Sequence, residues 1–301
     1  GLPAGWEQSP GADWSQAASA PTLQAAGLAQ DTPACWHAKA GWVQPARLVR
    51  ALLAQPGIEW CPRKSVARLQ RSPATDSAAT GDSTATGIWQ ALDDHGHTIA
   101  EAECVVLAAG PACNALLAAS SAPTLPLQSV RGQLSWGRQD TGAAALPPFP
   151  VNGNGGLVAH VPRDAGLAWH MGSTFERDVD ALPLTSAEVA AAHATNWRRL
   201  QELLPNAAPT LQAAFASTSP SDSAAVRAWA SVRCTATDRL PIVGPVDAQA
   251  LPGLWVCTAM GARGLTRAVL CGELLAALVN AEPLPLDARL ARAMGTARLE
   301  K

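Results

Sequence analysis

The sequence predicts a mixed α/β fold in which a few parallel strands accompany a separate antiparallel sheet. Three observations support this prediction. Residues 103–110 are apolar after Glu103, as is typical of a parallel strand that is buried on both faces. Several short strand-like segments between residues 125 and 171 alternate with turns, which favours an antiparallel sheet. Finally, an apolar strand at 254–258 turns through Gly261 and Gly264 into an apolar helix.

Composition indicates a globular protein. The chain has 301 residues, of which 48% are apolar and 15% charged, enough for one or two domains with a real core. No uninterrupted apolar stretch approaches the roughly 20 residues that span a bilayer, and no signal peptide is visible at the start. The seven cysteines are scattered without a metal-ligand spacing, so we expect no metal site, a reduced cytoplasmic setting, and burial of Cys104, Cys257 and Cys271.

Charge gives little information about partners. The formal net charge is −2, so no global electrostatic attraction to nucleic acid is expected. Lysine occurs only at positions 39, 64 and 301, and tyrosine is absent, which is more typical of a GC-rich coding bias than of a functional arginine patch. The charge therefore neither supports nor excludes an RNA partner.

In the first half of the chain, residues 1–40 show poor periodicity and predict loops and short helices. Residues 45–54 begin with proline and place leucines and valine at helical spacing, which predicts a helix. Strands are expected within 58–69, at 87–93 and at 103–110. The Ser/Thr/Ala/Gly/Asp tract at 72–87 predicts a hairpin tip or an insertion.

In the second half, strands are expected at 127–136, 156–161, 166–171, 226–232 and 254–258. A helix is expected at 185–204, because Ser186 and Glu188 lie near its start and Pro205 follows its end. The glycines at 152–156 precede a strand and not a helix, so they favour a hairpin turn over a phosphate-binding loop. We interpret the six histidines as structural or solvated.

The turn at Gly261 and Gly264 is the strongest local candidate for a site. A glycine turn that opens a helix, here near Leu265 and running to about Val279, directs free backbone N–H groups and the positive end of the helix dipole outward. Arg263 lies in this turn, and Arg233 precedes it in the chain. Such a turn suits an electron-rich ring or a carboxylate, and an ordinary strand–helix connection is the alternative.

Six segments occur in the same order as in a known family. Together they resemble the FAD-dependent domain of the bifunctional tRNA 5-methylaminomethyl-2-thiouridine biosynthesis proteins, the MnmC family, within the glycine oxidase/D-amino-acid oxidase superfamily. The segments are GWVQP at 41–45, VVLAAGP at 105–111, VRGQ at 130–133, GSTF at 172–175, VRCTATDRLPIVG at 232–244 and GARGLT at 261–266.

The resemblance implies an FAD-binding, Rossmann-like domain interleaved with an antiparallel substrate domain. Residues 1–124 would form the first part of the FAD-binding domain, 125–225 the substrate domain, and 226–301 the return to the FAD-binding domain. No G-x-G-x-x-G turn follows an N-terminal strand in this chain. We therefore expect the FAD-binding domain to be incomplete, lacking the N-terminal dinucleotide-binding unit and the methyltransferase domain that precede it in the family.

The resemblance also implies an activity. Family members oxidise a secondary amine with FAD and remove the carboxymethyl arm of 5-carboxymethylaminomethyl(-2-thio)uridine at the tRNA wobble position as glyoxylate. The implied partners are tRNA and, in trans, a methyltransferase domain or the missing N-terminal segment; no membrane is involved. Two alternatives stay open: an oxidase of glycine or another small amino acid, and a truncated, inactive remnant that serves as a binding or structural module.

Site residues follow from the same resemblance. Arg233 would bind the substrate carboxylate, with a salt bridge to Asp238 as the alternative, and Arg263 would bind that carboxylate or the flavin edge. These two are the catalytic candidates. The predicted cofactor contacts are Val66, Ala108, Ala109, Gly110, Gly261, Ala262, Arg263, Gly264, Leu265 and Thr266. The predicted substrate contacts are Trp42, Arg131, Gln133 and Arg233. For Trp42, Arg131 and Gln133, a role in the core or in a turn is the alternative.

Overall fold

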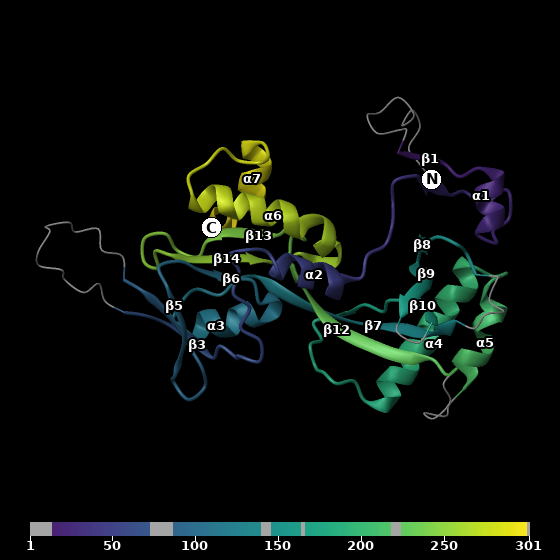
Figure 1. Ribbon diagram of the computed structural model, residues 1–301, viewed down its shortest axis with the longest axis horizontal. Coiled ribbons are helices and arrows are strands. Elements are labelled where there is room, and N and C mark those ends of the chain that lie inside the picture. The colour runs from purple at the N-terminus through teal and green to yellow at the C-terminus, as the bar shows by residue number, and fades with distance from the viewer. Residues whose placement is uncertain (1–13, 73–86, 140–145, 164–165, 218–223, 300–301) are drawn as a thin grey trace, which may run out of the picture. The chain divides into compact units, whose positions relative to one another are not determined.

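The computed structural model describes residues 14–72, 87–139, 146–163, 166–217 and 224–299. Its contacts divide the chain into two compact units (Figure 1). Unit 1 comprises the described parts of Gly1–Gln44, Arg131–Glu176 and Ala181–Ser231, and unit 2 those of Pro45–Val130, Arg177–Asp180 and Val232–Lys301. Residues 14–44 thus group with unit 1, whereas the sequence placed them with the FAD-binding part.

An antiparallel sheet forms the centre of unit 1. Its strands follow the order β11-β7-β10-β9-β8, and β12 also pairs with β7. Their bounds are β7 Leu127–Gln139, β8 Val151–Gly153, β9 Gly155–Arg163, β10 Gly166–Gly172, β11 Glu176–Arg177 and β12 Arg227–Ala236. The first residues of β7 and the last of β12 count with unit 2. The predicted strands at 127–136, 156–161, 166–171 and 226–232 are therefore confirmed, and the pairing of β8 with β9 confirms the hairpin at 152–156.

Two helices cover one face of this sheet. They are α4 (Ser186–Leu203), which confirms the predicted helix, and α5 (Ala208–Ala216), which the sequence did not indicate; α4 packs against β9, β10 and α5 (Figure 1). Thr185 caps α4 by accepting from the backbone N–H of Glu188. Trp169 is fully buried beneath the helices, and a Cβ at Gly137 would lie 2.7 Å from its ring. Close packing of the indole on β7 therefore requires glycine at that position.

The N-terminal part of unit 1 is a short hairpin with one helix. Strands β1 (Ser15–Ala17) and β2 (Cys35–His37) pair antiparallel, and α1 (Ala20–Ala25) lies between them in sequence. The Ser19 side chain accepts from the backbone N–H of Thr22 at the start of α1. The sequence predicted a short helix here but not the two strands.

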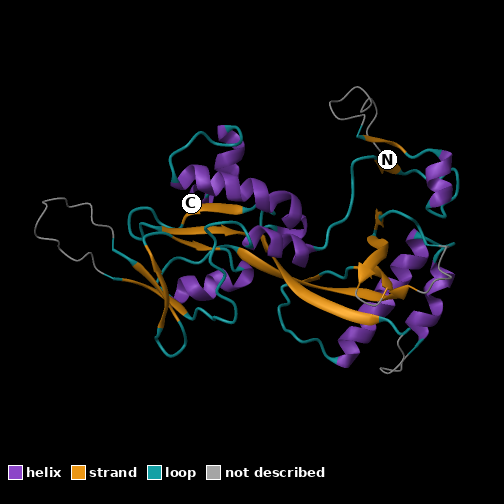
Figure 2. Ribbon diagram, viewed as in Figure 1, coloured by secondary structure: helices purple, strands orange, loops and turns teal. Residues whose placement is uncertain are grey.

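Unit 2 contains a small sheet in the order β13-β14-β6. Strand β6 (Val105–Leu107) runs parallel to β14 (Leu254–Thr258), and β13 (Ile242–Pro245) runs antiparallel to β14. The predicted parallel strand is thus confirmed, but the prediction that it is buried on both faces is wrong, since Val106 is 40% exposed. The 16-residue helix α6 (Gly264–Val279) packs on β13 and β14 (Figure 2).

The rest of unit 2 surrounds this sheet. A second sheet has the order β3-β4-β5. The remaining elements are β3 Arg68–Arg71, β4 Trp89–Leu92, β5 Thr98–Ala102, α2 Pro45–Leu53, α3 Cys113–Ala119, α7 Ala288–Met294 and the 3-10 turns η2 Gly110–Ala112, η3 Gly261–Arg263 and η4 Thr296–Leu299. Helix α2 and strand β4 confirm two predictions. The prediction for 58–69 is largely wrong, because 58–67 form no strand, and most of the tract at 72–87 lies outside the described residues.

Each unit has its own core. In unit 1, Trp169, Met171 and Leu200 lie at the centre of one cluster. In unit 2, Leu117 and Leu254 are fully buried in another. Cys271 is buried as predicted, whereas Cys104 is exposed, so its predicted burial is wrong. Within the described part of the chain, no helix has the length and apolar character that crossing a membrane requires.

Candidate cofactor and substrate site

Two of the predicted cofactor segments meet at one edge of the β13-β14-β6 sheet. Because β6 and β14 are parallel, with Leu107 opposite Val256, both strands end at the same edge. The Thr258 hydroxyl, at the end of β14, donates to the carbonyl of Gly110 at 3.4 Å. Ligands of open α/β sheets bind outside the carboxyl ends of parallel strands. The structure therefore places 108–110 beside the turn that leads into 261–266.

The backbone at this edge adopts conformations that favour glycine. Gly110 and Gly261 have φ values of 59° and 61°, in the left-handed region. A Cβ would lie 3.6 Å from the Cys234 Cβ at Gly110 and 3.5 Å from the Thr235 Oγ1 at Gly261. Both turns therefore lie in van der Waals contact with β12, and the absence of a side chain at each glycine leaves its backbone uncovered by a Cβ.

The start of α6 offers hydrogen-bond donors. No side chain of the described residues caps its N-terminus, and Leu265 and Thr266 in its first turn are exposed, as are Ala262 and Arg263 in η3. The first N–H groups of a helix lack partners within the helix, and the dipole makes this end positive. These residues fit the electron-rich ring of a flavin.

Arg233 lies in β12, next to this edge. Side chains alternate along a strand, so Arg233 and Thr235 share one face of β12 and Cys234 points to the other. Cys234 Sγ lies 3.8 Å from the Thr258 hydroxyl, and Thr235 forms an isolated β-bridge with Met260, just before η3. Arg233 therefore lies two residues before Thr235, the position of β12 that contacts the turn at Met260.

The electrostatics of Arg233 suit a carboxylate. Its side chain is half-buried, and burial lowers its pKa. Because arginine starts far above neutral pH, the guanidinium stays charged. A planar cation with reduced hydration binds a carboxylate through two parallel, charge-assisted hydrogen bonds.

Asp238 is the alternative salt-bridge partner that the sequence suggested for Arg233. In the structure it forms an ion pair with Arg298. The Nε of Arg298 donates to Asp238 Oδ2 at 2.8 Å, and this contact holds the pKa of Asp238 below its usual range. Arg298 also donates to the carbonyl of Leu240 at 3.3 Å. This ion pair fastens the C-terminal end of unit 2 to the segment after β12.

Arg131, a predicted substrate contact, lies in the interior of unit 1. Its side chain is only 4% exposed; the guanidinium donates to Glu176 at 3.1 Å, to Glu188 at 2.6 Å and to the carbonyl of Ala181 at 2.9 Å. A backbone hydrogen bond from Thr185 and then the contact with Arg131 lower the pKa of Glu188 to about 2. Arg131 therefore joins β11 to the start of α4, and this geometry does not support its predicted contact with substrate.

Gln133, also predicted to contact substrate, is fully buried. Its Nε2 donates to the carbonyl of Val189 at 3.2 Å, which links β7 to α4. This placement does not support a substrate contact either. Trp42 is 40% exposed, and Val66 packs at the margin of the unit 2 core, so their predicted roles stay predictions.

His193 belongs to a polar network between the sheet and α4. Its Nδ1 is hydrogen-bonded to the Ser135 Oγ at 2.7 Å, and the Phe215 ring lies edge-on at 6.4 Å between centroids. Burial lowers the pKa of His193. The structural role that the sequence analysis gave to this histidine agrees with these contacts.

A pH dependence follows from this lowered pKa. Between the folded pKa and the unfolded value of about 6.5, the unfolded chain binds more protons, so the free energy of unfolding falls as pH falls below about 6.5. Replacing His193 with glutamine should reduce this loss, measured by urea unfolding between about pH 7 and 5. Replacement of His95, whose side chain is 74% exposed, is the matched control and should leave the slope unchanged. Equal slopes for both variants and the wild type would contradict the prediction.

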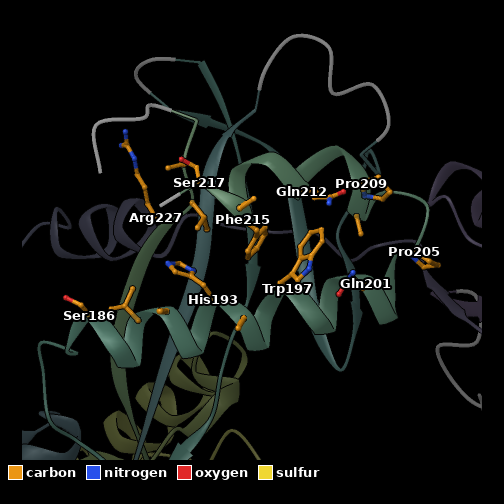
Figure 3. Close-up of a pocket in the computed structure, with 17 residues that line it drawn as sticks. Ser186, His193, Trp197, Gln201, Pro205, Pro209, Gln212, Phe215, Ser217 and Arg227 are labelled. Carbon is orange, nitrogen blue, oxygen red and sulfur yellow. The ribbon is translucent and has the colours of Figure 1, made fainter. Parts of the chain in front are cut away.

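A groove of about 930 Å³ lies on the helical side of unit 1. His193 and Trp197 of α4 point toward Phe215 of α5, and the rings of Trp197 and Phe215 lie 5.1 Å apart (Figure 3). None of the predicted site residues lines this groove. Among the described residues, no group of three or more His, Cys, Asp or Glu side chains could hold a metal ion.

Comparison with known proteins identifies the family. The sequence model described as "FAD dependent oxidoreductase" (DAO) matches residues 4–278. The chain belongs to this family. The matched range includes both segments that meet beside Thr258. Members of this family depend on FAD, the cofactor predicted from the sequence. The predicted fold class and cofactor are confirmed.

Two relatives carry a more specific name. The "tRNA 5-methylaminomethyl-2-thiouridine biosynthesis bifunctional protein MnmC" of Verminephrobacter eiseniae is 52% identical over 99% of this chain and 48% of its own length. The protein of the same name from Delftia acidovorans is 53% identical over 99% of this chain and 45% of its own length. The chain therefore spans about half the length of the curated relatives it matches, and the predicted resemblance is confirmed.

Solved structures show the same fold. A thermally stable mutant of fructosyl peptide oxidase matches with a TM-score of 0.62 and 12% identity, over 96% of this chain and 68% of its own. Iminodiacetate oxidase from Chelativorans matches with a TM-score of 0.59 and 15% identity, over 95% and 69%. At this identity the similarity concerns the fold alone.

The residues that join the two segments were not predicted from the sequence. Thr258, Cys234 and Thr235 all contact Gly110 or the residues before η3, and none was a candidate. Thr258 ends an apolar strand, and such a position is a weak signal for a polar contact at the sheet edge. The contacts of Cys234 and Thr235 depend on the position of β12, which the sequence does not show.

Proposed function

We propose that this protein uses FAD to oxidise a secondary amine that carries a carboxylate. The proposed substrate is 5-carboxymethylaminomethyl(-2-thio)uridine at the wobble position of tRNA, which loses its carboxymethyl arm as glyoxylate in the cytoplasm. The observation that carries the proposal is the edge where Gly110 and the start of α6 meet beside the β12 strand that bears Arg233. The names of the relatives support the tRNA substrate.

The reaction needs few groups from the protein. Oxidation removes two electrons and two protons from the N–CH₂ bond of the arm, and water hydrolyses the resulting imine to glyoxylate and the shortened amine on the uridine. Bound FAD supplies the acceptor for the two electrons. The protein has to hold the arm in one orientation, because correct positioning removes much of the entropic barrier.

Each part of the site then has a defined task. Arg233 binds the carboxylate of the arm and so fixes the adjacent carbon. The N–H groups of Leu265 and Thr266, at the positive end of α6, favour negative charge on an electron-rich ring placed above them. Arg263, exposed in η3, adds a second positive charge at the same end. Ala108, Ala109 and Gly110 would hold the cofactor phosphates through their backbone, and Val66 would contact the adenine.

The test is the release of glyoxylate by the FAD-loaded protein. We expect glyoxylate from tRNA that carries the carboxymethylaminomethyl group, in an amount equal to the shortened base formed, and none from tRNA that lacks the arm. Faster release from free glycine would favour the amino-acid oxidase alternative. A protein that binds FAD but releases glyoxylate from neither compound would favour the inactive binding module.

A further inference from the structure

The sheet of unit 1 has a second face, opposite α4 and α5, that carries aromatic and cationic side chains. Trp169 and Met171 of β10 are fully buried in the core on the helical side, so His170 between them points to the other face. The Trp136 ring of β7 stacks with His170 at 6.2 Å between centroids and 15° between planes. Trp136 therefore lies on this second face as well.

Two arginines are held against the Trp136 ring. The Cζ of Arg163, in β9, lies 4.0 Å from the ring centroid. Arg227, in β12, also borders the groove on the helical side (Figure 3), but its Cζ lies 5.3 Å from the Trp136 centroid. Both arginines are exposed, and neither forms an ion pair with a carboxylate of the described residues. Cation–π contacts fix the two guanidinium groups near one another despite their mutual repulsion. An anion bound between them would relieve that repulsion.

The described side chains next to the two arginines add no negative charge. Burial, followed by the positive charge of Arg163, lowers the pKa of His170, so this ring is neutral at neutral pH. Trp229 lies two residues after Arg227 in β12 and therefore on the same face. Its side chain is 57% exposed, which gives a large indole surface beside the two cations.

We propose that this face binds single-stranded RNA, with Arg163 and Arg227 contacting backbone phosphate and Trp229 stacking on a base. A fixed pair of cations beside an open aromatic ring matches the alternation of phosphate and base along an unpaired strand. An acidic peptide would satisfy the cations but would leave the indole without a planar partner. The formal net charge of the chain is −2, so attraction to RNA has to come from such a local cluster.

This inference rests on the proposed function, because the substrate named there is an unpaired nucleotide of an anticodon loop. It goes further by assigning the RNA contact to one face of unit 1. It also adds residues that were not predicted from the sequence, since the cluster combines side chains of four strands, β7, β9, β10 and β12. Binding can be measured without FAD, so the contact can be tested separately from the oxidation.

The experiment measures binding of a fluorescently labelled anticodon stem–loop RNA to the full chain by anisotropy over a range of salt concentrations. Arg163→Ala combined with Arg227→Ala should weaken binding at least tenfold at low salt. The slope of log affinity against log salt should fall by about 0.7 for each phosphate that the double variant can no longer neutralise. Trp229→Ala should weaken binding about tenfold with little change in that slope.

Matched controls exclude general effects of charge and of exposed indoles. Arg198→Ala removes an exposed arginine of α4, on the opposite side of the sheet, and Trp60→Ala removes an indole that is 62% exposed in unit 2. Both should bind RNA as the wild type does. Circular dichroism melting should show that all variants are folded, as expected for exposed side chains.

Several outcomes would overturn the inference. These are cluster variants that bind RNA as tightly as the controls do, a wild-type chain that binds no RNA, and a wild-type chain that binds poly-glutamate in preference to RNA. Failure of the proposed function looks different. In that case the cluster variants would still lose RNA binding, but no glyoxylate would form; if instead the modified nucleoside were oxidised by a protein that does not bind RNA, only the present inference would fail.

Discussion

Replacing Arg233 with alanine should lower kcat/KM for the carboxylate-bearing amine about 100- to 1,000-fold. The substitution removes two charge-assisted hydrogen bonds, at about 1.5–2 kcal/mol each, and every 1.4 kcal/mol corresponds to roughly a tenfold change in rate. Steady-state kinetics with the FAD-loaded protein measure the change.

Controls separate this role from a structural one. The Arg233→Ala protein should keep the visible spectrum of bound flavin, since the proposed cofactor contacts are 108–110 and 261–266. Arg233→Lys should recover part of the activity, because lysine restores the charge without the planar fork. Arg289→Ala, which replaces an exposed arginine of α7, should behave as the wild type does. A full kcat/KM in the alanine variant would remove the carboxylate role from Arg233.

Replacing Gly253 with alanine should lower the free energy of unfolding by about 2–4 kcal/mol. The residue immediately precedes β14 and has φ 86°, a region that alanine rarely adopts. A Cβ there would lie 2.3 Å from the backbone carbonyl oxygen of Glu103. That oxygen cannot move easily, because the backbone N–H of Val105 donates to the Gly253 carbonyl at 2.8 Å and fixes the two segments together.

The matched control is Gly272 in α6, where nothing lies within 4 Å of an added Cβ. Alanine in a helix interior is favoured over glycine by about 0.5–1 kcal/mol, so this variant should be more stable than the wild type. Urea unfolding at neutral pH measures both. Equal stability of the two variants would show that the junction of β6 and β14 is less constrained than the structure indicates.

The sequence predicted those helices and strands whose apolar residues and flanking turn residues lie within one short segment. The strand at 254–258 and the helix after it were found because an apolar run, two glycines and a long apolar segment follow one another. Residues 58–67 also contain apolar side chains, but Pro62, Arg63 and Lys64 interrupt them, and Arg63 has φ 59°, outside the extended region, so this segment forms no strand. Strand β13 and helix α5 are short, and they depend on tertiary packing. The intrinsic helix and strand propensities of their residues do not predict that packing.

The candidate site was likewise predicted only in part from the sequence. The two cofactor segments were predicted from a family resemblance, but their meeting depends on the pairing of β6 with β14 and on the Thr258 hydroxyl. Arg131 belongs to a motif shared with the family, and a motif does not distinguish a ligand contact from a buried ion pair. Its carboxylate partners, Glu176 and Glu188, are 45 and 57 residues away in sequence. Such pairs can be recognised only in three dimensions.

Flavin reduction under anaerobic conditions tests the central claim most directly. The FAD-loaded protein is mixed without oxygen with tRNA bearing 5-carboxymethylaminomethyluridine and, in parallel, with the same tRNA lacking the carboxymethyl arm. We expect the visible absorbance of oxidised flavin to disappear in the first mixture, with one glyoxylate formed for each flavin reduced, and to persist in the second. Persistence of the absorbance in both mixtures would contradict the proposed reaction.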